Sequence, residues 1–361
     1  MRLRACLPKA GARGSILEWF RMFKMNVVRT LFALGLMIGC AQGAQAGLLD
    51  QVQKRGYVIC GSNPGVPGFG LPDDKGGWTG FDVDFCRAVA AAIFNDPTKV
   101  KFIALSAKDR FTALQSGEVD LLSRNTTWTL SRETGQGFLF AGITYYDGQG
   151  FLVRKKLNLS SALELSGASI CVQQGTTTEL NLADFFRGNN MKYEPVNFAN
   201  AEEAVRAFEG GRCDAYTTDA SGLYVERQRL ADPEDSVVLP EIISKEPLGP
   251  AVRQGDDGWF NVVKWTLFAL VNAEELGVTS KNVDEKAKSD RPEVRRLLGF
   301  EGNFGEPLGL DADWAYRIVK HVGNYGEIFD RNLGDSSPLK IKRGINALWT
   351  KGGLQYAPPI R

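Results

Sequence analysis

The sequence predicts an α/β protein with two lobes, each containing a mostly parallel sheet, and a hinge between them. Its 361 residues are too many for one small hydrophobic core, so two lobes are the natural expectation. Strand-like and helix-like segments alternate, which is typical of parallel strands connected by crossover helices. This alternation occurs twice along the chain.

The first alternating unit comes after a short amino-terminal stretch. Phe81, Phe85 and Val89 recur at helical spacing, and Gly117 is placed where a second helix would end. We therefore expect strands at 56–62, 99–105 and 119–123 and helices at 81–94 and 110–117.

The second unit repeats the pattern, with expected strands at 150–155, 168–174, 192–198 and 213–218 and helices at 176–187 and 201–211. "ALQSGEVDLL" in the first unit matches "AFEGGRCDAY" in the second at an offset of about 94 residues. The match is short, and one extended sheet is the alternative. The chain length favours two lobes.

Two segments that carry Gly or Pro, 145–153 and 245–256, bracket the second unit and are expected to be the crossings between lobes. Lobe 1 is then discontinuous, with residues 47–150 and 251–361, and lobe 2 comprises 151–250. Residues after 256 read as helices, and the closing stretch 349–361 is expected to wrap around lobe 1.

The amino-terminal segment 1–46 has the pattern of a signal peptide. Arg29 precedes an apolar run at 31–41 that is too short to span a bilayer, and "AQA" at 44–46 resembles a cleavage site. Residues 1–24 look like an upstream extension, because Met22 or Met25 is a better start. A lipoprotein signal at Cys40 is the less favoured alternative. We expect export to the periplasm of a Gram-negative bacterium.

Charge and cysteine usage agree with export. Residues 1–46 hold seven of the 43 Lys and Arg residues and one of the 42 Asp and Glu residues, so the remainder has a net charge of −5. That balance argues against a nucleic-acid partner. Four cysteines remain after cleavage, and none forms a CxxC motif. Each lobe contains one pair, so we favour disulfides over buried free thiols, with the pairing Cys60–Cys86 and Cys171–Cys213.

The residue types present exclude several chemistries. His321 is the one histidine, and it sits in an amphipathic helix, so multi-histidine metal sites and Ser-His-Asp catalysis are not expected. Asp82 and Asp84 lie at the start of a helix, where their carboxylates interact favourably with the positive end of the helix dipole. The glycine-rich stretch 61–77 has neither GxGxxG nor GK[ST]. We therefore expect no catalytic residue, no metal and no cofactor.

Three polar clusters come after expected strands: 124–132, 173–179 and 217–221. In open α/β sheets, ligands bind beyond the carboxyl ends of the strands. Arg132 could clamp a carboxylate, and Asp219 could accept from an ammonium group. Thr176 and Glu179 suit a capping box at a helix N-terminus. Each residue alone could be structural, but together they suit a zwitterion.

The stretch "GFDVDFCRAVAAAI" (80–93) resembles the signature of the periplasmic solute-binding proteins (family 3) of polar amino-acid ABC transporters. The resemblance extends over the segment after 46 and is strongest to the general L-amino-acid-binding branch. It implies a type II, clamshell-like binding protein. Such a protein would be a non-enzymatic monomer that binds L-amino acids of broad specificity in the cleft and delivers them to an ABC permease in the inner membrane.

The resemblance also implies roles for individual residues. Arg132 corresponds to the arginine that binds the α-carboxylate, and Asp219 corresponds to the aspartate that binds the α-ammonium. Thr127 corresponds to the family's threonine five residues before that arginine, and Asn125 to the residue that supplies a carbonyl, so the stretch forms the wall that binds both α-groups. The lobe-2 turn corresponds to Gly175, Thr176 and Thr177.

Some positions depart from the family pattern. Gly65 and Ala107 stand where narrow-specificity relatives have aromatic rings, which favours a roomy pocket, and Arg124 replaces a small residue. Phe69, Trp78 or Trp128 could supply a ring instead. An exported cyclohexadienyl or arogenate dehydratase is the alternative function, and a sensory role stays open.

Overall fold

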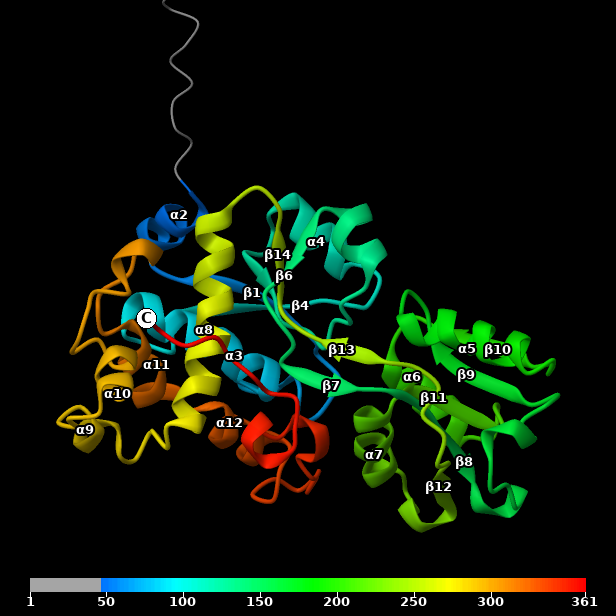
Figure 1. Cartoon of the computed structure of the whole chain (residues 1–361). Helices are drawn as coiled ribbons and strands as arrows, with labels where there is room; N and C mark the ends of the chain where they lie inside the picture. Colours follow the sequence, from blue (N-terminus) through cyan, green and yellow to red (C-terminus); the bar gives the residue numbers. More distant parts are fainter. Residues whose placement is uncertain (1–46) are drawn as a thin grey trace, which may run out of the picture. The chain divides into compact units, whose positions relative to one another are not determined.

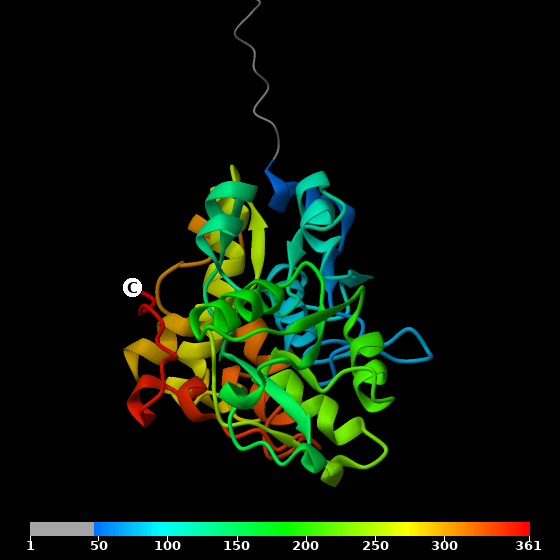
Figure 2. The ribbon, with the colours of Figure 1, turned by 90° about the vertical axis from the view of Figure 1, so that its right-hand side faces the viewer.

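The computed structural model describes residues 47–361, and the predicted signal peptide lies outside them. The described chain contains two separate five-stranded sheets, each flanked by helices (Figure 1). The alternative of one extended sheet is therefore wrong. Figure 2 shows the lobe of the second sheet, coloured green, facing the viewer.

The first sheet has the strand order β4-β1-β5-β14-β6. Strands β4, β1 and β5 are parallel, whereas β14 runs antiparallel to both of its neighbours. The sheet is mixed because the chain comes back from the second lobe and adds β14 in the opposite direction. The strands are β1 (Val58–Ser62), β4 (Val100–Ala104), β5 (Leu121–Leu122), β6 (Phe138–Phe140) and β14 (Ala251–Arg253).

The second sheet has the order β10-β9-β11-β8-β12 and is also mixed. Strands β10, β9 and β11 are parallel, while β8 and β12 add antiparallel pairs. The strands are β8 (Gln149–Arg154), β9 (Ser169–Gln173), β10 (Glu194–Phe198), β11 (Ala215–Asp219) and β12 (Ser236–Val238).

The helices follow the predicted alternation in both lobes. Helix α3 (Phe81–Phe94) is almost entirely buried, because its apolar residues pack on the first sheet on one side and on later helices on the other. With the first sheet lie α2 (Leu48–Arg55), α4 (Arg110–Ser116), α8 (Asp257–Glu275), α9 (Val283–Lys286), α10 (Pro292–Leu297), α11 (Trp314–Val322) and α12 (Tyr325–Asn332). With the second lie α5 (Thr177–Gly188), α6 (Ala201–Glu209) and α7 (Ala220–Arg229).

The segment 311–332 belongs to the region after residue 256 that is expected to be helical, and it forms two helices, α11 and α12. Gly323 adopts φ +93°, and Asn324 caps α12 by accepting from the Glu327 N–H. A positive φ interrupts a right-handed helix, and the cap then starts a new one. His321, at the end of α11, contacts Asn95 through a 2.8 Å hydrogen bond.

The two expected crossings pair with each other. Strand β7 (Tyr145–Asp147) forms an antiparallel ribbon with β13 (Glu246–Leu248), and β8 and β14 continue from this ribbon into the two sheets. The carboxy-terminal segment braces the same ribbon. The Asn346 side chain accepts from the Tyr146 N–H and donates to the Tyr146 carbonyl. The remaining short pair is β2 (Leu71–Pro72) with β3 (Trp78–Thr79).

Both predicted disulfides are present. Cys60 in β1 is bonded to Cys86 in α3, and Cys171 in β9 is bonded to Cys213 just before β11. All four cysteines are buried, so the disulfides join core elements within each lobe. Buried free thiols, the alternative, are excluded.

Candidate functional site

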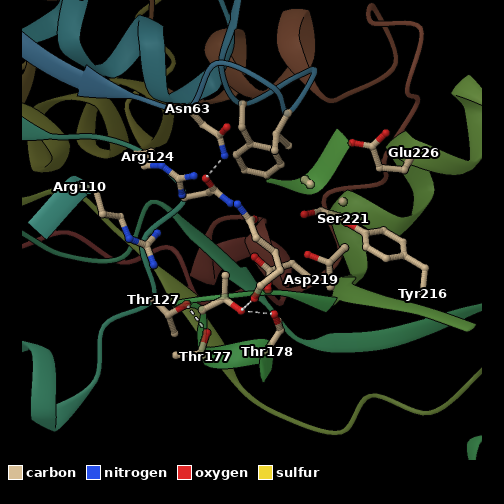
Figure 3. A pocket seen from close by; sticks show the side chains of 18 residues that line it. Asn63, Arg110, Arg124, Thr127, Thr177, Thr178, Tyr216, Asp219, Ser221 and Glu226 are labelled. Carbon is tan, nitrogen blue, oxygen red and sulfur yellow. Dashed lines mark hydrogen bonds between the residues drawn. The ribbon is translucent and has the colours of Figure 1, made fainter. Parts of the chain in front are cut away.

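A pocket lies between the two lobes, at the carboxyl ends of β1, β5, β9 and β11 (Figure 3). Five of the seven residues predicted to bind ligand line it: Asn125, Thr127, Thr176, Thr177 and Asp219. The other two do not form its wall. Arg132 lies behind Thr127 and donates to the Thr127 carbonyl, and Gly175 directly precedes Thr176 in the sequence.

The wall from the first lobe is the loop after β5, and Asp82 holds it in place. The Asp82 carboxylate accepts from the Asn125 N–H at 2.6 Å and from the Ser123 hydroxyl at 3.2 Å. Asn125 adopts φ +35°, a conformation that asparagine tolerates better than most residues. Burial raises the pKa of Asp82 to about 6, although both hydrogen bonds favour its charged form.

Arg132 lies behind this wall in a short π-helical turn, Ser131–Gly135. Its Nη1 donates to the Thr127 carbonyl at 2.8 Å, and its guanidinium stacks 5.1 Å above the Phe111 ring. Burial lowers the pKa of Arg132 to about 10, so the group remains a cation at neutral pH. Its Nε and Nη2 have no hydrogen-bond partner among residues 47–361 and can donate to a ligand.

Two further guanidinium groups reach the pocket. Arg110 opens helix α4, and Arg124 comes directly after β5 and Ser123. Burial lowers the pKa of Arg124 to about 10 and that of Arg110 well below its usual value, and the neighbouring guanidiniums lower both further. The first-lobe wall is therefore strongly basic.

The wall from the second lobe begins at the amino end of α5. The Thr176 hydroxyl accepts from the Glu179 N–H at 3.2 Å, as the sequence predicts. The Glu179 carboxylate, however, accepts from the Gly175 N–H at 3.0 Å instead of closing the predicted capping box on Thr176. Gly175 adopts φ +72°, which turns its N–H toward the helix.

Asp219 supplies negative charge from the second lobe. It ends β11 and caps α7 without a side-chain capping bond, and its carboxylate has no hydrogen-bond partner among the described residues. Burial, together with the nearby carboxylates of Asp147 and Glu246, raises its pKa well above the usual range. A ligand cation in the pocket would stabilise the ionised form.

Glu246 lies between the two walls in hinge strand β13 and is fully buried. Its Oε2 accepts from the hydroxyls of Thr127 at 2.6 Å and Thr177 at 2.7 Å, one from each lobe. Its Oε1 accepts from Asn181 and Ser244. The two hydroxyls lie 3.1 Å apart, and each has one proton, which it donates in its hydrogen bond to Glu246. The two hydroxyls can therefore accept from a ligand but cannot donate to one.

Sequence reasoning assigned no role in the site to Asn63 and Arg110, which line the pocket, or to Asp82 and Glu246, which hold its walls. Asn63 comes directly after β1, and Arg110 begins the helix after β4, so the rule about strand ends could have identified both. Asp82 was predicted to serve only its helix dipole. Its contacts with the loop after β5, like those of Glu246, are long-range and leave no signal in sequence spacing.

Among the aromatic residues predicted to supply a ring, Phe69 lines the pocket, and Tyr216 from the second lobe joins it. Trp78 stacks on Phe102 and Trp128 on Phe140, so neither forms the wall. Residues 47–361 contain no cluster of His, Cys, Asp and Glu suited to a metal ion. None of their helices is both long and apolar enough to cross a bilayer.

Comparison with known proteins identifies relatives along nearly the whole described chain. The family described as bacterial extracellular solute-binding proteins, family 3, matches residues 58–282. A general L-amino acid-binding periplasmic protein, AapJ of Rhizobium johnstonii, is 62% identical over 323 residues, which are 89% of this chain and 95% of that protein. The glutamate/glutamine/aspartate/asparagine-binding protein BztA of Rhodobacter capsulatus is 57% identical over 322 residues, again 89% and 95%.

Solved structures agree. A periplasmic binding protein of an ABC transporter from Brucella ovis, with glutathione bound, is 62% identical, with a TM-score of 0.86, and covers 88% of this chain and 100% of its own. An ancestral amino acid-binding protein described as a precursor of cyclohexadienyl dehydratase is 29% identical, with a TM-score of 0.55. It covers 66% of this chain and 98% of its own. These similarities establish the two-lobed, type II binding-protein fold.

Proposed function

The chain belongs to the bacterial extracellular solute-binding proteins of family 3, and from that premise we propose that it is the periplasmic substrate-binding component of an ABC importer. It binds L-amino acids of broad specificity in the pocket between its lobes and delivers them to a permease in the inner membrane. It does so as a monomer and without catalysing a reaction.

The observation that carries this proposal is the charge pattern of the pocket. Asp219 offers a carboxylate without a partner, and the opposite wall offers guanidinium groups without a carboxylate partner. An α-amino acid presents one ammonium and one carboxylate group, so it complements both walls at once. Charged groups buried in this way need such pairing to be stable.

Individual roles follow from the hydrogen bonds. Asp219 accepts from the ammonium group, together with the Thr127 hydroxyl, whose proton is already donated to Glu246. Arg132 donates to the α-carboxylate with the nitrogen atoms that the Thr127 carbonyl leaves free. The first N–H groups of α5, after Thr176, can donate to the same carboxylate, because the first turn of a helix has unpaired donors.

The names of the relatives support an amino-acid ligand. AapJ is a general L-amino acid-binding protein, and BztA binds glutamate, glutamine, aspartate and asparagine by name. The dehydratase alternative is not favoured, since these relatives are binding proteins and the ancestral precursor structure is itself an amino acid-binding protein.

We place the lobes at 47–150 with 251–361 and at 151–250, with the β7–β13 ribbon as the hinge. Closure about this ribbon would bring Asp219 and Arg132 onto the same ligand. Residues 1–46 are proposed to be a signal peptide, removed on export.

Calorimetry on residues 47–361 tests the function. The protein is unfolded and refolded to remove carried ligand and then titrated with a panel of L-amino acids. One-to-one binding of acidic, polar and aliphatic members supports a general receptor. Binding of one member alone keeps the function and overturns the broad specificity. Absence of binding to the whole panel overturns the amino-acid ligand, and prephenate and arogenate are then the next compounds to titrate.

A further inference from the structure

Three buried guanidinium groups gather at the pocket: Arg110 and Arg124 line it, and Arg132 lies behind its first-lobe wall. Arg110, Arg124 and Arg132 are 3%, 3% and 6% exposed, and none forms an ion pair with any residue of 47–361. Burying a guanidinium without an anionic partner is costly, so their grouping at one pocket requires an explanation.

Arg124 has donors to spare. Its Nε donates to the Leu105 carbonyl at 2.8 Å, and its two Nη atoms have no hydrogen-bond partner in the described chain. A guanidinium has five N–H donors. A purely structural role, holding Leu105, would therefore use only a small part of this group.

Arg110 is in a similar state. Its Nη1 lies 3.5 Å from the Thr126 hydroxyl, its buried Nε has no partner, and its guanidinium is 4.7 Å from the Phe111 ring. Figure 3 shows Arg110 and Arg124 on the same wall of the pocket, with Asp219 and Ser221 on the opposite one.

The carboxylates around these two groups are already engaged or assigned. Asp82 is held by Asn125 and Ser123, and Glu246 accepts four hydrogen bonds of its own. Asp219 is the acceptor for the ligand ammonium in the function proposed above, and Arg132 takes the α-carboxylate. Arg110 and Arg124 therefore line the pocket with donors that neither the α-carboxylate nor the ammonium group uses.

We propose that Arg124, assisted by Arg110, forms a second carboxylate subsite, so that the preferred ligands carry two carboxylates. Acidic amino acids and γ-glutamyl peptides belong to this class. Paired planar guanidiniums suit a carboxylate, because each can donate two parallel hydrogen bonds. Amino acids with uncharged side chains bind through the α-groups and leave this subsite to water. The proposal rests on the proposed function.

The test compares L-glutamate with its neutral isostere L-glutamine, by calorimetry at neutral pH on refolded wild type, Arg124→Gln and Arg124→Lys. Wild type is expected to bind glutamate more tightly. Arg124→Gln removes the charged partner of the side-chain carboxylate, so it is expected to weaken glutamate about 100-fold relative to glutamine. Arg124→Lys retains the charge and is expected to recover part of that preference. Arg110→Gln is expected to act in the same direction, more weakly.

Reduced glutathione is titrated as a second dicarboxylate, and the exposed Arg187→Gln is the matched control. Equal weakening of glutamate and glutamine in Arg124→Gln, with no change in their ratio, would overturn the second subsite and leave the proposed function intact. Wild type that binds neither amino acid would instead overturn the proposed function. Thermal unfolding of each variant identifies any that fails to fold, and the ratio in Arg110→Gln then decides.

Discussion

In the first lobe Asp120 precedes strand β5, and in the second Asp214 precedes β11 in the same position. The Asp120 carboxylate accepts from the Ile59 N–H at 2.7 Å, and the Asp214 carboxylate accepts from the Ser169 N–H at 2.9 Å. Gly117 and Gly211, three residues earlier, adopt φ +81° and +80°. The two lobes therefore repeat one β-α-β-α-β unit in detail.

The lobes differ in the segment that comes after the third strand of that unit. After β5 the chain forms a loop that carries Arg124 and leads to Arg132, whereas after β11 helix α7 begins at once, with Asp219 as its N-cap. The repeated scaffold thus places two walls opposite each other, and the segments after the third strand give them opposite charge. Substitutions in either wall, in the scaffold and in the hinge test this division of roles.

Removal of the basic clamp has the largest expected effect. In Arg132→Ala the α-carboxylate of every ligand loses its partner, and binding should weaken about 1000-fold or become undetectable. Calorimetry with the amino-acid panel measures it, with exposed Arg187→Ala as the control. Normal binding by Arg132→Ala would show that the first-lobe wall is not the carboxylate wall.

Removal of the acidic charge comes next. Asp219→Asn keeps the shape and one acceptor oxygen but removes the charge that faces the ammonium, so affinity should fall about 100-fold for all amino acids. The same titration serves, with the exposed Asp184→Asn as the control. An unchanged affinity would show that the ammonium group binds elsewhere and that the second-lobe wall is not the acidic one.

The shared scaffold can be tested through its two aspartates. Asp120 is buried and also binds Arg55, whereas Asp214 is partly exposed. Burial raises the pKa of Asp120, while hydrogen bonds from Ser169 lower that of Asp214. We expect Asp120→Ala to reduce the free energy of unfolding by about 3 kcal/mol and Asp214→Ala by about 1 kcal/mol. Denaturant melts measure both free energies of unfolding. A larger loss in Asp214→Ala than in Asp120→Ala would contradict the idea that the two aspartates have the same role and differ only in burial.

Glu246 links the two walls and can be tested by selectivity. In Glu246→Gln one of the two carboxylate oxygens becomes an NH2 group, so either the hydroxyls of Thr127 and Thr177 or the side chains of Asn181 and Ser244 lose their acceptor. The substitution also removes a negative charge near Arg132. Amino-acid binding should weaken about 10-fold, because the hydroxyls of Thr127 and Thr177 are no longer held by a charged acceptor. Binding of the corresponding α-hydroxy acid, an anion without an ammonium, should weaken less. Equal loss for both compounds would indicate a structural role alone.

The smallest expected effect concerns pH. Burial raises the pKa of Asp147 to about 6, above the unfolded value, so its ionisation destabilises the fold. The native state then binds the extra proton between about pH 4 and 6, and this contribution to stability is lost as pH rises through 6. Asp147→Asn should gain about 1 kcal/mol relative to wild type between pH 5 and pH 7. Parallel unfolding free energies over that range would contradict the raised pKa.

The sequence by itself determined the alternation of elements, the family signature at 80–93 and the polar clusters after the strands. Helix α3 begins and ends where periodicity predicts, because its apolar spacing and its flanking Gly80 and Asn95 are local signals. The two disulfides could be predicted by placing each cysteine pair in one lobe. The mixed character of both sheets could not be predicted, because the direction of a strand that comes after a crossing depends on where the chain re-enters the sheet.

Tertiary structure alone decided how the site is wired. Arg132, Thr127 and Asp219 stand out in the sequence, but Glu246 in the hinge contacts Thr127 from 119 residues away. Its role depends on two lobes meeting at one carboxylate, and no spacing in a single chain encodes that meeting. The same holds for the buried guanidiniums of Arg110 and Arg124. Their charge is visible in the sequence, but whether a partner neutralises it is a property of the packed structure.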